Sequence, residues 1–244
     1  MITGTAHVET LTQEIATIEQ WSNLGAELLG VESFQLIAEM RSTAREAVLP
    51  AGLHPTSPPA LSIQAWNVAE SPWGPFSFAT TRVSCRSGVR ARGFTTAAVA
   101  STATAAEGLT GCFGFPTTVG PVKLRRHYDG VDLESEGLVV TGLDPTPLGS
   151  SDVQYTGTLN LANTPNGLRL VQVEATHSGD RVERVQGRIL DFDPAQWGNS
   201  LLSPYHVVST SIAVETINLP AVRFVCRPGE LAFSGTEKIE IEQR

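Results

Sequence analysis

Residues 114–124 read GFPTTVGPVKL, with two adjacent threonines, Thr117 and Thr118, ahead of a lysine. That lysine, Lys123, and Lys238 are the only lysines, so the 17 basic residues comprise 17 − 2 = 15 arginines. Any mechanism that needs a lysine amine therefore has two candidates. The stretch before it, TATAAEGLTG (102–111), is rich in small residues and predicts a helical turn between strands.

Strand patterns surround this stretch on both sides. From Ala60 onward, short apolar and alternating segments such as PFSFATTRVSCR, GLVVTG and YHVVSTSIAVETINL are separated by turn signals such as SPWGP, NTPNG and HSGD. Many antiparallel strands at regular spacing favour a barrel or a sandwich, because a barrel removes exposed strand edges. We predict a mainly β (α+β) fold in a single domain over 1–244.

The N-terminal region has a different pattern. In Thr10–Leu29, apolar residues recur every three or four positions, which predicts an amphipathic helix ending at Gly30 and an N-terminal helical segment over 1–30. FQLIAEMR (34–41) reads as a strand. STAREAVLPAGL then predicts a short helix capped by Ser42 or Thr43.

Composition excludes several classes of function. The chain has 244 residues and a formal net charge of −8, so nucleic acid is an unfavourable partner and a membrane surface is disfavoured. The N-terminus lacks the basic and apolar regions of a signal peptide, and we expect a cytoplasmic protein. The chain also lacks GxGxxG, GxxxxGK[ST], HExxH, GxSxG and any CxxC pair. We therefore expect no cofactor, no metal and no disulfide framework.

The segment LSIQAW (61–66) is a candidate pocket wall. Alternation places Gln64 and Trp66 on one face of a strand and Leu61 and Ile63 on the other. The apolar face belongs to the core. The mixed face either lines a cavity, with Gln64 as hydrogen-bonding group and Trp66 as apolar wall, or packs Trp66 under a loop.

Two carboxylates that could act as a pair, Asp191 and Asp193, lie in the segment LDFDP. They precede a proline at a strand end, where Asp commonly makes turn hydrogen bonds, and we favour that interpretation.

Three stretches in order resemble one family: AREAVLPAGLHPTSPPALSI, ESPWGPFSF and AAEGLTGCFGFPTTVGPVKL. They are similar to the LPPGL-x-P, G-x-Y-x-E and G-R-E-x-x-G-F-P-K-K-L motifs of the acetoacetate decarboxylase family. The match covers roughly residues 35 to 143 by motif. The resemblance implies a double-layered, cone-shaped antiparallel β-barrel with an interior pocket, in a homo-oligomer.

The resemblance also implies a chemistry that this chain lacks. In the family, the first lysine of the PKK run forms a Schiff base with a β-keto acid, and the second lowers its pKa. Matched by position, these lysines fall on Thr117 and Thr118. Threonine has no amine, so we expect no decarboxylation by that route. Lys123 lies six residues from Thr117, about 20 Å along a strand, too far to replace it.

The other ionisable positions of the family motifs are also neutral here. The arginine and glutamate of GRE fall on Thr110 and Gly111, and the glutamate of G-x-Y-x-E falls on Phe78. A further carboxylate of the family would lie near Gln64. The resemblance therefore implies a pocket lined by neutral hydrogen-bonding groups.

The predicted site combines these groups. The catalytic candidates are Thr117, Thr118 and Gln64, and the substrate-binding candidates are Trp66, Ser77, Phe78, Phe113 and Phe115. Such a pocket can orient and polarise a carbonyl. If a proton must move, the candidates are His127, His177 and His206.

Three hypotheses follow. The first is an enzyme of specialised metabolism, a cyclase, dehydratase, isomerase or other lyase that acts on a carbonyl-bearing, largely apolar small molecule without a Schiff base. The second is a non-catalytic protein that binds a small molecule. The third is a decarboxylase or aldolase that uses Lys123 in a register different from the one inferred above.

Overall fold

The computed structural model describes residues 2–11, 15–149 and 157–240. Within them, one mixed sheet of sixteen strands follows the order β16-β15-β12-β11-β6-β5-β4-β2-β14-β13-β10-β9-β8, with β1, β3 and β7 paired beside it. The strands are β1 (Ala16–Thr17), β2 (Ala26–Glu39), β3 (His54–Pro55), β4 (Ala60–Val68), β5 (Phe76–Ser87), β6 (Arg90–Ala100), β7 (Thr117–Val119), β8 (Val122–Arg126), β9 (Gly130–Ser135), β10 (Leu138–Leu148), β11 (Gly157–Thr164), β12 (Gly167–Val173), β13 (Thr176–Phe192), β14 (His206–Leu219), β15 (Phe224–Cys226) and β16 (Thr236–Lys238). The helices are η1 (Val8–Thr10, a 3₁₀ helix), α1 (Ser42–Val48), α2 (Ala103–Phe113) and α3 (Ala232–Gly235).

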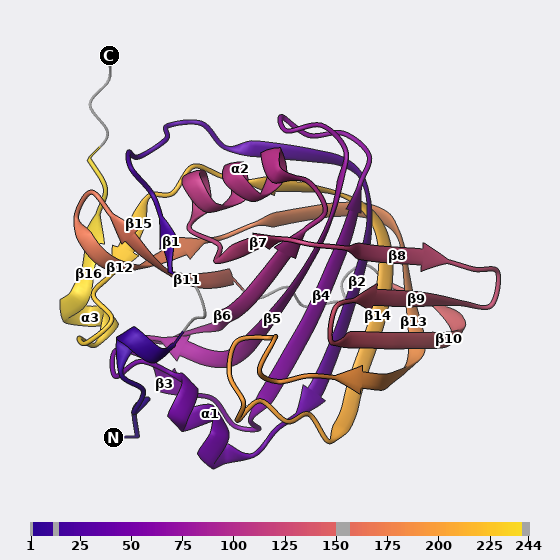
Figure 1. Ribbon diagram of the computed structural model, residues 1–244, viewed down its shortest axis with the longest axis horizontal. Helices are drawn as coiled ribbons and strands as arrows, with labels where there is room; N and C mark the ends of the chain where they lie inside the picture. The colour runs from indigo at the N-terminus through magenta and orange to yellow at the C-terminus, as the bar shows by residue number, and fades with distance from the viewer. Residues whose placement is uncertain (1, 12–14, 150–156, 241–244) are drawn as a thin grey trace.

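The sheet folds over itself into two layers (Figure 1). On β4, Ile63 and Ala65 share a buried cluster with Val122 of β8 and Leu133 of β9, so the β8–β9–β10 end of the sheet covers one face of β4. Gln64 lies on the opposite face of β4 and is also buried. The pairing path over the described residues ends at β16 and β8 without joining them, and a closed cone-shaped barrel stays a prediction.

The predicted N-terminal helix is wrong. The described part of Thr10–Leu29 contains the end of η1, the two-residue β1 and the start of β2, while residues 12–14 lie outside the described residues. Leu11 is buried in one hydrophobic cluster and Ile18 and Leu28 in another, whereas Leu24 is exposed. The helix-like spacing therefore does not define one buried face, and pairing with the sheet decides the structure.

Both short helices are confirmed. α1 begins at Ser42, but its N-cap is Arg41 and makes no side-chain cap, so the predicted Ser42 or Thr43 cap is wrong. α2 is longer than the predicted turn. Its cap, Thr102, accepts a hydrogen bond from the backbone N–H of Ala105 at 3.3 Å, and Gly114 ends it at φ 69°. No described helix is long and apolar enough to cross a membrane.

A β-bulge interrupts β13 where it pairs with β14. His177 lies opposite Ile217 and Gly179 opposite Glu215, but Arg181 lies opposite Val214, so one extra residue separates Gly179 from Arg181. The extra residue shifts the alternation by one, so residues an even number apart across the bulge lie on opposite faces of the sheet. A Cβ on Gly179 would lie 2.6 Å from the carbonyl oxygen of Val214, so this close approach requires glycine.

The two halves of β13 consequently face different surroundings. Beyond the bulge, the buried Glu183 pairs with Arg126 of β8 and, at 3.0 Å, with Arg181, which ties the two layers together. Before the bulge, His177 pairs with Glu215 on the side of the interior cavity described next.

Candidate functional site

A small cavity lies within the sheet on the face of β4 opposite the β8–β9–β10 layer. Its volume is about 20 Å³, which is room for one water-sized group. Residues from β4, β5, β11, β12, β13 and β14 and from the segments before β7 and β13 line it: Gln64, Trp66, Arg82, Phe115, Thr158, Val173, Ala175, His177 and Leu219.

Arg82 of β5 supplies a buried positive charge. Its side chain is 5% exposed, and its Nη1 donates a hydrogen bond to Oγ1 of Thr158 on β11 at 2.7 Å. Burial lowers the pKa of Arg82 to about 10, with a smaller opposing effect from Cys85. The guanidinium therefore stays charged at neutral pH and can hold a carboxylate or a developing oxyanion.

Gln64 is held in place by its neighbour on β2. Gln35 and Gln64 are directly opposite in the antiparallel β2–β4 pair, and Nε2 of Gln64 donates to Oε1 of Gln35 at 2.6 Å. Both side chains are buried. The pair fixes the orientation of a neutral polar group at the cavity wall.

His177 of β13 brings an acid–base group to the same cavity. Its Nδ1 lies 3.2 Å from Oε2 of Glu215, a carboxylate whose side chain is 3% exposed. Oε1 of Glu215 is buried and has no hydrogen-bond partner within the described part of the chain. A carboxylate beside Nδ1 orients the imidazole.

Aromatic rings form the apolar wall. The ring centroids of Trp66 and Phe78 are 4.9 Å apart, and the ring of Phe78 meets that of Phe115 edge-on at 5.6 Å. Trp66 and Phe115 line the cavity, while Phe78 is fully buried beside them. The alternative that Trp66 packs under a loop is therefore not what the structure shows.

The two predicted catalytic threonines lie elsewhere. Thr117 is half-buried, and its hydroxyl donates to the carbonyl oxygen of Phe115 at 3.3 Å. Thr118 is exposed, and its hydroxyl donates to the carbonyl oxygen of Ala98 at 3.4 Å. Neither side chain lines the interior cavity. Their catalytic role stays a prediction that this geometry does not favour.

Three predicted substrate-binding residues are not part of the cavity lining: Phe78, which is buried beside it, Ser77 and Phe113. Ser77 is half-buried, and its hydroxyl donates to Oδ1 of Asn67 at 3.2 Å. Phe113 is buried and packs edge-on against Trp73, with ring centroids 6.3 Å apart. Of the predicted set, the structure brings Gln64, Trp66 and Phe115 together.

Neither lysine reaches the interior cavity. Lys123 is exposed on β8, between Val122 and Leu124, which face the other layer. Lys238 is exposed on β16. The cavity lining contains no amine.

The remaining candidates from the sequence do not line the interior cavity. His206 is exposed, and His127 is exposed and pairs with Asp132 at 3.0 Å. Asp193 accepts a hydrogen bond from the backbone N–H of Ala195 at 3.0 Å, the turn interaction expected for LDFDP. No group of three or more His, Cys, Asp or Glu side chains suited to a metal occurs among the described residues.

Sequence reasoning missed Arg82, Thr158 and Glu215. Alternation along PFSFATTRVSCR puts Arg82 on the same face as Phe78, and this signal could have identified it. Glu215, within SIAVETINL, is a lone carboxylate in an apolar strand, a pattern that indicates a buried charge with a partner.

Comparisons with known proteins agree with this geometry at the level of the fold. No protein-family model matches the chain. No curated protein matches it. Acetoacetate decarboxylase from Legionella pneumophila is similar in structure, with a TM-score of 0.73 and 18% identity over 84% of this chain and 88% of that one.

Two further solved structures are similar. The enduracididine biosynthesis enzyme MppR, complexed with pyruvate, has a TM-score of 0.67 and 16% identity over 83% of this chain and 90% of that one. An acetoacetate decarboxylase-like enzyme from Sphingomonas wittichii has a TM-score of 0.66 and 13% identity over 82% of this chain and 92% of that one. The resemblance inferred from the three sequence stretches is thus confirmed: the chain has the acetoacetate decarboxylase-like fold.

Proposed function

We propose that this chain is a small-molecule enzyme, a lyase or isomerase in the broad sense, that acts on a carbonyl-bearing substrate without forming a Schiff base. The observation that carries the proposal is the convergence of Arg82 and His177 on one cavity. A fixed cation and an oriented imidazole are the groups needed to stabilise an enolate and to move a proton. The polar wall at Gln64 adds a third group.

The chemistry divides among these residues. Arg82, held by Thr158, would bind the oxygen on which negative charge develops. His177, held by Glu215, would take a proton from the carbon beside the carbonyl or return one. In water-excluded sites, each such contribution is worth about 10² to 10⁴ in rate.

The small volume limits what can enter. About 20 Å³ accommodates a single oxygen or water, so a larger substrate requires the side chains of Trp66 and Phe115 to move. In this proposal, Trp66 and Phe115 contact the apolar part of the substrate. Thr117 and Thr118, whose hydroxyls bind backbone carbonyls, position the strand and do not react.

The solved neighbours support the substrate class. MppR has been solved with pyruvate and with the condensation product of pyruvate and imidazole 4-carboxaldehyde. Pyruvate and the aldehyde are both carbonyl compounds. We extend to this chain only the carbonyl-bearing class. A role in specialised metabolism, a homo-oligomer and a closed barrel stay predictions from the resemblance.

The experiment follows keto acids, diketones and aldehydes by NMR with the unmodified protein, His177→Asn and the control His127→Asn. Intact mass after borohydride treatment is measured in parallel. Turnover that His177→Asn abolishes, that His127→Asn preserves and that leaves no adduct supports the proposal. Equal turnover by His177→Asn, or an adduct on a lysine, overturns it.

A second function, binding of a small molecule without reaction, remains as the alternative. The groups that converge on the cavity, Arg82, Gln64 and His177, can also hold a ligand that is not converted. Saturable binding without product, lost in Arg82→Met, would select this alternative.

A further inference from the structure

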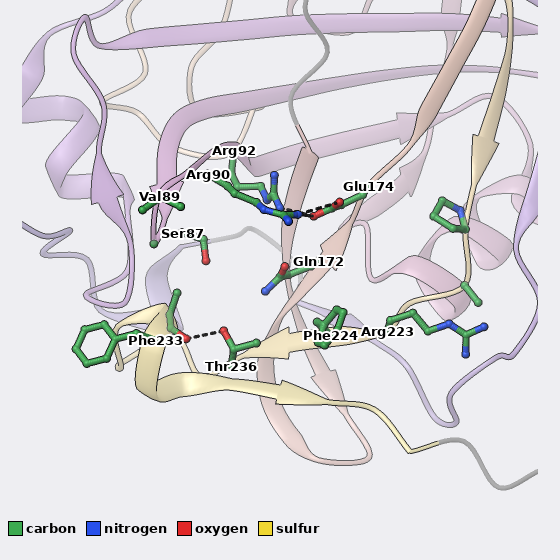
Figure 2. A pocket seen from close by; sticks show the side chains of 14 residues that line it. Ser87, Val89, Arg90, Arg92, Gln172, Glu174, Arg223, Phe224, Phe233 and Thr236 are labelled. Carbon is green, nitrogen blue, oxygen red and sulfur yellow. Dashed lines mark hydrogen bonds and ion pairs between the residues drawn. The ribbon is translucent and has the colours of Figure 1, made fainter.

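A second, larger concavity shares no lining residue with the interior cavity, although residues adjacent in the chain, such as Gln172 and Val173, line one and the other. Its volume is about 690 Å³. It lies between the β5–β6 turn, β12, the segment into β15, and α3, as Figure 2 shows. Pockets of about 300–1,000 Å³ accommodate small organic molecules.

Positive charge gathers at this concavity. Arg90 and Arg92 both converge on Glu174 (Figure 2), with Arg90 at 3.0 Å. Arg223 also lines it and has no ion pair among the described residues. Three arginines and one carboxylate thus line this concavity, in a chain whose net charge is −8.

One of these arginines is buried. The side chain of Arg92 is 9% exposed, and its Nε has no hydrogen-bond partner in the described structure, although its terminal nitrogens bind Glu174 and the carbonyl oxygen of Ala91. A buried N–H without a partner is costly, and a ligand acceptor that rearranges this cluster would offset that cost.

Apolar groups complete the lining. Phe224 is 45% exposed and Val89 is 94% exposed, and Phe233 of α3 is also exposed. Large apolar side chains gathered at a concave surface mark a binding site more often than an inert one. Phe224 begins β15 directly after Arg223, and both residues line the concavity, so it contains an apolar surface and a cation.

We propose that this concavity binds an amphipathic organic carboxylate. The carboxylate pairs with Arg223, the Arg90–Arg92 pair adds positive charge to the same concavity, and the apolar body lies against Phe224. Arginine favours carboxylates because its planar donors match their geometry. The site is independent of the proposed reaction in the interior.

The test uses isothermal titration calorimetry of the full chain with naphthalene-2-carboxylate and, as an uncharged match, naphthalene-2-carboxamide. The variants are Arg223→Gln and Phe224→Ser, and Arg188→Gln, an exposed arginine on β13, is the control. His177→Asn reports on binding in the interior cavity. Circular dichroism confirms that each variant is folded.

We expect the carboxylate to bind about tenfold or more tightly than the amide, and Arg223→Gln and Phe224→Ser to weaken it about tenfold or more. Arg188→Gln and His177→Asn should leave its affinity unchanged. Absence of binding at about 1 mM, equal binding of the amide, or weakening by His177→Asn overturns the proposal. So does an oligomer that Phe224→Ser dissociates without any carboxylate binding, because the surface would then join copies of this chain.

Discussion

The interior cavity and the surface concavity differ in volume by more than an order of magnitude, about 20 against 690 Å³, and the smaller one contains the more reactive groups. The interior brings together a histidine, a fully buried arginine and an amide, each held by a named partner. The surface concavity has arginines beside open apolar surface. Volume alone therefore does not show where the polar and ionisable groups of this chain converge.

The difference extends to how the polar groups are held. In the interior, Arg82 and Gln64 are fixed by short hydrogen bonds before any ligand arrives, which is the arrangement that stabilises a transition state without reorganisation. At the surface, Arg223 is exposed and free to change rotamer. The first arrangement suits reaction, and the second suits binding.

The largest expected effect separates the two regions by function. His177→Asn removes the group proposed to transfer the proton and should lower turnover of any substrate found by NMR by about 10² to 10⁴. Binding of naphthalene-2-carboxylate should not change. Glu215→Gln, which acts through His177, should lower kcat more than it raises KM. An unchanged kcat in His177→Asn would contradict the proposal that reaction takes place in the interior cavity and binding alone in the surface concavity.

The next effect compares one substitution in both regions. Phe78→Ala, in the interior wall, should lower the free energy of unfolding by about 3–5 kcal/mol because it leaves a cavity. Phe233→Ala, at a side chain that is 86% exposed, should change it by less than about 0.5 kcal/mol. Urea unfolding measures both. Similar losses would mean that the surface phenylalanine is packed in solution.

A smaller effect concerns Cys85. Burial raises the pKa of this thiol from 9.0 to about 12, against smaller opposing effects of a backbone hydrogen bond at Phe94 and of the charges of Arg92 and Arg82. The unfolded chain then releases the proton above about pH 9 while the folded chain keeps it, so stability falls as pH rises through this window.

We expect the protein to be about 1 kcal/mol less stable at pH 10 than at pH 8, since the lowered pKa of Arg82 offsets part of the loss only near pH 10. Cys85→Ala should abolish this loss, whatever its effect at pH 8. Urea unfolding at the two pH values tests it. An unchanged slope in the variant would show that another group titrates.

The smallest effect is expected from Lys123→Ala. The side chain is exposed on β8, so turnover should stay constant and the free energy of unfolding should change by less than about 0.5 kcal/mol. Borohydride should trap no adduct on the unmodified protein. Loss of turnover in this variant would restore the amine mechanism and shift the reaction away from the interior cavity.

Part of this site could be predicted from sequence, and the rest depends on long-range pairing. Alternation in LSIQAW correctly placed Gln64 and Trp66 on a cavity face, because strand periodicity is local. Phe115 came from the family motif. Arg82 and Thr158 are 76 positions apart, and only the folded sheet brings them together.

The fold shows the same division. The ordered motifs identified the acetoacetate decarboxylase-like fold, since they extend over the central strands and α2. The helix predicted over Thr10–Leu29 is wrong because Leu11 and Leu28 are buried in different hydrophobic clusters. The spacing of apolar residues in this segment does not indicate which strands pair with β2.

The bulge between Gly179 and Arg181 has a genetic consequence. Deletion of a single codon there would remove the extra residue and restore a regular ladder, with His177 still opposite Ile217 and Glu183 still opposite Ile212. Both side chains would keep their sides of the sheet. A one-codon deletion in the regular ladder beyond the bulge would instead move every later side chain to the opposite face. In homologous genes, one-residue length changes in β13 should therefore occur at the bulge more often than in the regular ladder on either side.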